Sequence, residues 1–190
     1  MIKKGKYDFT PFPEMETGRL ILRQLKESDS PEIFFLRTDE GVNRYIERPK
    51  PENINGARDF ILKTNNGIKQ NEMIDWAITL KDAHNLIGTI CLWNFSKDKT
   101  RAEVGFELNP EYQGQGIMNE ALEIILEFGF KTVALTSIDA YTHYDNLNSI
   151  KLLKKNGFEK NSKLKDNENS NNIIFTITSK QLIKNKCHSA

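Results

Sequence analysis

The chain has 190 residues, of which 38% are hydrophobic and 28% charged, and its formal net charge is +1. Such a chain is typical of one soluble globular domain, and its near-zero charge gives no general attraction to nucleic acid or to a membrane surface. No apolar run approaches the roughly 18 residues of a membrane-spanning helix, and the N-terminal stretch lacks the apolar core of a signal peptide. We expect a cytoplasmic protein with free thiols at Cys91 and Cys187, without a metal site.

The first half of the chain is predicted to hold an arm, a strand and two helices. Residues 1–16 contain two prolines and predict an irregular N-terminal arm. Alternating leucines over residues 19–25 indicate a strand. A helix is expected to begin after Ser28, and a second one is predicted over residues 57–69, beyond the proline-containing loop 48–56.

The second half alternates between strands and helices. Its predicted elements are, in chain order, strands over 75–81, 86–95 and 101–109, a helix over 116–130, a strand over 133–143, a helix over 146–158 and a strand over 173–178. The first three of these strands are joined by short polar turns, which favours an antiparallel meander. The last ten residues, 181–190, are polar and are expected to form a tail.

Two glycines stand at the mouth of the helix predicted over 116–130. A helix start offers backbone N–H groups without internal partners and a partial positive charge, which together bind phosphate. Gly114 and Gly116 have no Cβ to obstruct such an approach, although they could simply make a tight turn. Position 119 is Asn and the preceding strands look antiparallel, so a G-x-G-x-x-G dinucleotide fingerprint is rejected, as is a nucleotide P-loop.

Four segments, in order, carry a resemblance to one family. "QGQGIM" (113–118) resembles the Q/R-x-x-G-x-G/A signature of the GNAT superfamily of acyl-CoA-dependent N-acyltransferases. "TGRLILR" (17–23) resembles the opening of its RimJ/RimL-type branch, which acetylates the N-termini of ribosomal proteins. "AEVGFEL" (102–108) is similar to the strand before the coenzyme loop, and "NLNSIKLLKKNGF" (146–158) to the N-x-x-S…GF segment.

The resemblance covers residues 17 to about 178 and implies one GNAT domain over residues 17–180. That fold is of the α/β (α+β) class, with a mostly antiparallel mixed sheet of about six to seven strands flanked by about four helices. It further implies an N-acetyltransferase that takes the acetyl group from acetyl-CoA and transfers it to a primary amine. The partners expected are therefore acetyl-CoA and an amine acceptor, and the chain is expected to be a monomer or a homodimer.

The resemblance also assigns coenzyme-binding residues. They are Leu108, Gln113, Gly114, Gln115, Gly116, Ile117, Met118, Asn119 and Asn146. Met118 departs from the usual Gly or Ala, but the phosphate contacts in the family are made by the backbone, so a side chain that points away is tolerated. Asn146 would hydrogen-bond the pantetheine arm, and its position also suits a helix N-cap.

Two residues are candidates for catalysis. Glu103 lies on the strand where several family members carry a glutamate base, with Glu107 on the same face as second choice. Ser149 matches the serine proposed in the RimL-like group to stabilise the departing thiolate. The plainer alternatives are a solvent-facing or ion-paired Glu103 and a helix-capping hydroxyl at Ser149. Leu153 occupies the position of a frequent tyrosine acid, which excludes that acid here and favours the RimJ/RimL-like branch.

The acceptor is predicted from amine chemistry. An α-amine has a pKa near 7.7–8.0 and a lysine amine near 10.4, so the α-amine needs about 3.5 kcal/mol less work to lose its proton at neutral pH. A protein N-terminus is therefore the expected acceptor. A small amine such as an antibiotic, a polyamine or an amino acid remains an alternative, as does an acyl-CoA-binding module without catalysis.

Overall fold

A mixed β-sheet runs through the described part of the chain, residues 7–182 of a computed structural model. Its spatial order is β1-β2-β3-β4-β5-β6-β8-β7, and only the β5–β6 pair is parallel. The strands are β1 (Met15–Glu16), β2 (Leu20–Gln24), β3 (Ile74–Leu80), β4 (Ala83–Trp93), β5 (Arg101–Leu108), β6 (Ser137–His143), β7 (Glu159–Lys160) and β8 (Asn172–Thr178). The predicted mixed, mostly antiparallel sheet is confirmed, as is the meander of β3, β4 and β5.

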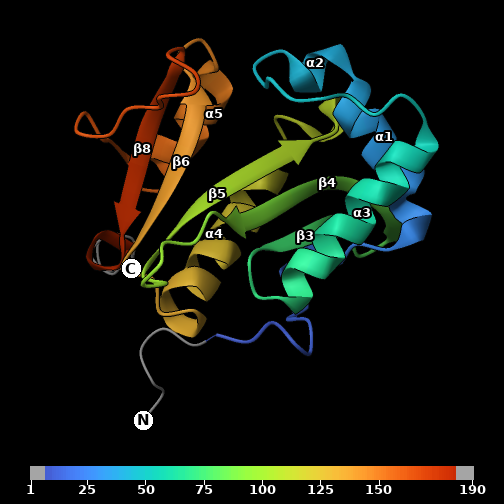
Figure 1. Cartoon of the computed structure of the whole chain (residues 1–190), viewed down its shortest axis with the longest axis horizontal. Coiled ribbons are helices and arrows are strands. Elements are labelled where there is room, and N and C mark those ends of the chain that lie inside the picture. The colour runs from blue at the N-terminus through green and yellow to red at the C-terminus, as the bar shows by residue number, and fades with distance from the viewer. Residues whose placement is uncertain (1–6, 183–190) are drawn as a thin grey trace.

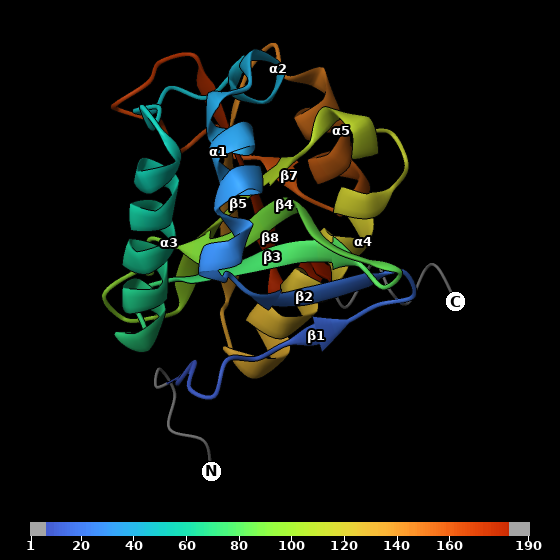
Figure 2. The ribbon, with the colours of Figure 1, turned by 90° about the vertical axis from the view of Figure 1, so that its right-hand side faces the viewer.

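Helices cover both faces of the sheet (Figures 1 and 2). They are α1 (Ser30–Thr38), α2 (Glu40–Asn43), α3 (Ile54–Lys69), α4 (Ile117–Glu127) and α5 (Leu147–Lys155), with 3-10 turns at Glu27–Asp29 and Pro110–Tyr112 and a π-turn at Phe128–Thr132. Apolar residues of α1 and α3 pack against Ala77 and Leu86 on one face. α4 and α5 pack their apolar sides into the larger core on the other face. None of the helices in residues 7–182 is long and apolar enough to cross a membrane.

The interior strand β3 is buried along almost its whole length because both of its faces are covered. Trp76 is fully buried beneath α4, and its indole N–H donates to the carbonyl of Pro13 at 2.8 Å. This bond satisfies the one polar group of the indole in the core. The N-terminal segment is therefore fixed to the sheet, and residues 15–16 of the predicted irregular arm pair with β2 as β1.

Several predicted boundaries were wrong. α3 begins at Ile54 rather than 57, because the side chain of Asn53 accepts the Asn55 N–H and caps the helix. β6 begins at Ser137 rather than 133, because the chain first completes the π-turn after α4. The sheet has eight strands where six to seven were expected, and α2 is a fifth α-helix where about four were expected. Residues 183–190 of the predicted tail, with Cys187, lie outside the described residues.

The strands β5 and β6 part from each other along their length. They pair only at Arg101–Ser137, Ala102–Ile138 and Glu103–Asp139. Beyond these pairs β5 continues to Leu108 and β6 to His143, and the two strands diverge (Figure 1). A parallel pair that opens in this way exposes backbone groups in the middle of a sheet, where a bound molecule can reach them. The candidate site is built around this opening.

Candidate active site

The start of α4, residues 114–119, is a candidate anion-binding cradle. Gly114 has φ of 73° and Gly116, the N-cap residue, has φ of 77°, both in the left-handed region that favours glycine. The tight-turn interpretation therefore holds, and it does not compete with phosphate binding. Within residues 7–182, the backbone N–H groups of residues 114–119 donate to no acceptor. A Cβ built on Gly114 meets no atom within 4 Å, so the space beside Gly114 is open. Open donors at a helix start fit a pyrophosphate group.

Two glutamine side chains of the loop before α4 hydrogen-bond to nearby backbone carbonyls and stabilise its conformation. Gln113 donates from Nε2 to the carbonyl of Leu108 at 3.0 Å, and Gln115 donates from Nε2 to the carbonyl of Glu111 at 2.8 Å. Both amides are thus used within the loop. The contribution of these residues, and of Leu108, to a coenzyme site would come from the backbone and from the shape that they hold.

The first turn of α4 points its apolar side chains into the core. Ile117 and Met118 are 2% and 8% exposed, so the Met118 side chain does point away from the open donors. Asn119 donates to Glu123 at 2.6 Å and accepts from Asn156 at the end of α5 at 3.1 Å. The side chain of Asn119 therefore joins the two helices, and its backbone N–H remains with the cradle.

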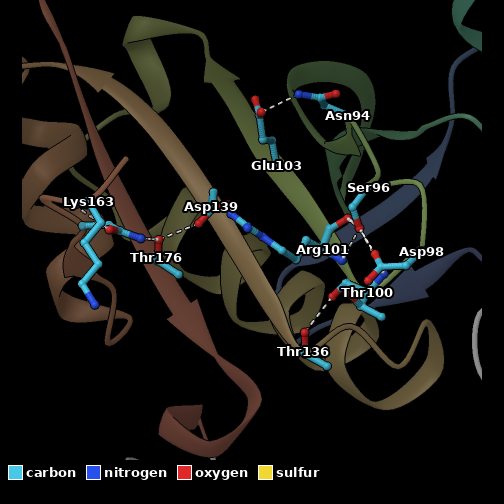
Figure 3. A network of polar contacts seen from close by, with 11 residues as sticks. Asn94, Ser96, Asp98, Thr100, Arg101, Glu103, Thr136, Asp139, Lys163 and Thr176 are labelled. Carbon is cyan, nitrogen blue, oxygen red and sulfur yellow. Dashed lines mark hydrogen bonds and ion pairs between the residues drawn. The ribbon is translucent and has the colours of Figure 1, made fainter. Parts of the chain in front are cut away.

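Glu103 lies at the last paired position before β5 and β6 diverge. Its carboxylate accepts a hydrogen bond from Asn94 Nδ2 at 2.6 Å (Figure 3). Burial raises the pKa of Glu103, the Asn94 bond opposes the rise, and the negative charge of Asp139 adds to it. Trp93, the last residue of β4, pairs with Glu103 in the sheet and is 46% exposed. A half-buried carboxyl with a raised pKa beside an open strand edge is suited to accept a proton.

Asp139 stands beside Glu103 and is ion-paired with Arg101. Its carboxylate accepts from Arg101 Nη2 at 2.7 Å and from the hydroxyl of Thr176 (Figure 3). Tyr141, two residues further along β6, is 38% exposed, and its pKa is raised by burial and then by Glu103. Sequence reasoning did not single out Asp139 or Tyr141. Only the strand register places them beside Glu103, and that register was not known.

Glu107 has a different environment from Glu103, although both lie on the same face of β5. It is 8% exposed and pairs with Arg48 Nη2 at 2.5 Å. Arg48 also donates to Asn43 Oδ1 and to the carbonyl of Leu36, which ties the segment before α3 to the sheet. Since its carboxylate is held by the partly buried guanidinium of Arg48, Glu107 is poorly placed to take a proton from a substrate.

Asn146 and Ser149 form the start of α5. Asn146 Oδ1 accepts the backbone N–H of Ser149 at 3.1 Å, so the N-cap prediction for Asn146 is confirmed. The capping alternative for Ser149 is wrong, because its hydroxyl makes no hydrogen bond to any described residue. Leu153 is fully buried in the core and could not expose an acid to the opening.

A second buried acid was also missed. Asp75 on β3 is 4% exposed, and its Oδ1 has no partner among the described residues. Burial, and then the charge of Glu107, raises its pKa to about 8, so this carboxyl is mostly protonated at pH 7. It pairs across the sheet with Cys91, a free cysteine whose thiol pKa burial raises well above its usual value. Cys91 is therefore a protonated thiol rather than a nucleophile.

Comparison with known proteins points to one family. The family model described as "Acetyltransferase (GNAT) domain" matches residues 19–159. The chain is 32% identical to "Uncharacterized N-acetyltransferase YoaA" of Bacillus subtilis (strain 168), over 91% of this chain and 98% of that protein.

Two solved structures extend the comparison. One is the ribosomal-protein-S5-alanine acetyltransferase from Vibrio fischeri, with a TM-score of 0.74 and 25% identity over 87% of this chain and 96% of that one. The other is Mycobacterium smegmatis RimJ in complex with CoA-disulfide, with a TM-score of 0.75 and 18% identity over 86% and 83%. At the latter identity the likeness supports the fold alone.

Proposed function

The chain belongs to the GNAT family of acetyltransferases, and from this premise we propose that it acetylates the α-amine at the N-terminus of a protein or peptide. Members of this family use acetyl-CoA as the acetyl donor. The observation that carries the choice of acceptor is the charge around the strand opening. Burial raises the pKa of the Tyr141 hydroxyl, the carboxyl groups of Glu103, Asp139 and Asp166 raise it further, and the positive charge of Arg101 opposes them.

The same carboxyl groups favour the protonated form of an amine bound near Tyr141. A lysine amine would therefore stay protonated even more strongly than in water. An α-amine has a lower pKa from the outset, so a site of this charge can still use it at neutral pH. We propose that the coenzyme pyrophosphate lies against the N–H groups of residues 114–119, with Asn146 beside the pantetheine arm.

Glu103 and Ser149 take the two proton-related roles in this proposal. The amine nitrogen bonds to the carbonyl carbon of the thioester, and the carbon–sulfur bond breaks. The proton lost by the amine goes to Glu103, directly or through a water molecule. The departing thiolate accepts a hydrogen bond from the Ser149 hydroxyl, which has no other partner within residues 7–182.

Replacement of Ser149 by alanine tests the second role. We expect kcat to fall about three- to tenfold, which corresponds to about 1 kcal/mol, the net value of one hydrogen bond. The loss should be the same at every pH, because the thiolate leaves whatever the protonation state of the amine. Asn148→Ala, on the exposed side of the same helical turn, is the control. Equal kcat in Ser149→Ala and wild type would contradict the role.

The choice of acceptor is tested by thiol release from acetyl-CoA at pH 7. We expect a peptide with a free N-terminus and no lysine to react several-fold faster than the same peptide with a blocked N-terminus and one internal lysine. Faster reaction of the lysine peptide would contradict the acceptor proposal. Coenzyme binding without thiol release from any amine would show a binding module instead of an enzyme.

A further inference from the structure

Arg19 reaches the mouth of α4 from the start of β2. Its Nη1 donates to the carbonyl of Gln115 at 3.0 Å, and its Nε pairs with Glu120 Oε2 at 2.7 Å. Its Nη2 lies 3.6 Å from the position that a Cβ on Gly116 would occupy. No acceptor within the described residues takes the protons of Nη2. One edge of the guanidinium is therefore bound to the protein while another faces the cradle.

Glu120, which anchors the Arg19 side chain, is itself held by several hydrogen bonds. Glu120 accepts from the Thr17 hydroxyl at 2.5 Å and from the Arg19 backbone N–H at 2.9 Å, as well as from the Arg19 side chain. Burial alone would raise the pKa of Glu120, but these hydrogen bonds outweigh it and hold the pKa below its ordinary value. The carboxylate thus stays ionised and fixes the guanidinium in one orientation.

We infer that Arg19 is a coenzyme-binding residue, whose Nη2 donates to the pyrophosphate of acetyl-CoA held at the cradle of residues 114–119. The inference rests on the proposed coenzyme site. A planar guanidinium with a spare edge can give a charge-assisted hydrogen bond to a phosphate oxygen while its other edge keeps the loop in place. The six N–H donors supply only partial charges, and Arg19 would add the full positive charge there.

Arg19 could act on coenzyme binding in two ways: by holding the loop in place, or by contacting the phosphate with its positive charge. If Arg19 only holds the loop, then loss of its anchor should harm coenzyme binding as much as loss of Arg19 itself. If its charge contacts the phosphate, removal of the Glu120 charge leaves the guanidinium present and takes away a nearby negative group that repels the ligand. The two roles therefore predict opposite results for Glu120→Gln.

Isothermal titration with coenzyme A and with dephospho-CoA, which keeps the pyrophosphate but lacks the 3′-phosphate, provides the test. We expect Arg19→Gln to weaken both ligands by the same factor of about three to ten, since Arg19 is half exposed and its contact is screened by solvent. The factor should shrink as salt is added. Arg19→Lys should lose less, and Glu120→Gln should bind coenzyme A at least as tightly as wild type. Thermal unfolding confirms that each variant is folded.

Three results would overturn the inference. The first is unchanged affinity in Arg19→Gln, and the second is an equal loss in Arg19→Gln and Glu120→Gln, which would make Arg19 a brace. The third is a loss for coenzyme A but not for dephospho-CoA, which would move the contact to the 3′-phosphate. Wild-type protein that binds no coenzyme A would overturn the coenzyme site itself, and so is distinguished from failure of the Arg19 contact alone.

Discussion

Replacement of Glu103 by glutamine is expected to lower kcat about 10²–10⁴-fold at neutral pH, the usual contribution of a general base. Glutamine keeps the size of the side chain and can still contact Asn94, which now donates to Glu103 at 2.6 Å. It cannot accept the proton that the amine must lose. Affinity for acetyl-CoA should change little, because the proposed coenzyme contacts lie at the start of α4.

The pH dependence of the rate tests the role of Glu103 more specifically than a single activity value. Burial raises the pKa of Glu103, so the wild-type rate should fall as the pH drops through that raised pKa and the carboxylate gains a proton. The variant should lack this limb of the profile. Its deficit should shrink at high pH, where the amine deprotonates without help. Steady-state rates of thiol release from pH 5 to 10 provide the measurement.

Glu159→Gln is the matched control, since this glutamate is exposed on β7 at the far edge of the sheet. It should keep the wild-type rate and profile. Full turnover and an unaltered profile in Glu103→Gln would show that Glu103 is not the base. The enzyme would then work mainly by positioning an amine that is already neutral against the thioester.

The choice between Glu103 and Glu107 marks the limit of what the sequence could predict. The two residues are of one type, four positions apart, and on one face of the same strand, so no local pattern separates them. The difference comes from Arg48, which lies 59 positions away and forms an ion pair with Glu107, whereas Glu103 accepts its hydrogen bond from the uncharged amide of Asn94. Such pairings follow from packing between distant segments and leave no periodicity in the sequence.

Local chemistry, by contrast, could be predicted well. Gly157 lies just beyond α5, which ends at Lys155, and its φ of 84° is the conformation for which glycine is preferred after a helix. The same holds for the glycines before α4 and for the polar turns between β3, β4 and β5, because their conformations follow from the backbone preferences of the residues in them. The two-residue strands β1 and β7 could not be predicted, because they contain too few residues to show alternation and exist only through their partners.

The second large effect is expected at Gly116, where valine should weaken the binding of coenzyme A at least tenfold. Gly116 has φ of 77° and is exposed at the start of α4. A β-branched residue is strongly disfavoured in this conformation. Valine therefore either distorts the helix start, which misaligns the N–H donors, or places its methyl groups beside Arg19, where the phosphate would lie. Both consequences lower the affinity for coenzyme A, and titration calorimetry measures that affinity directly.

Gly157→Val separates this effect from general strain. Gly157 also has a positive φ, 84°, but it follows the end of α5 and lies outside the cradle. The two variants should lose comparable stability, because each forces a branched side chain into the left-handed region. Only Gly116→Val should lose affinity for coenzyme A in titrations of folded protein. If folded Gly116→Val binds coenzyme A as wild type does, the open N–H groups at residues 114–119 are not the coenzyme site, and the glycines serve the turn alone.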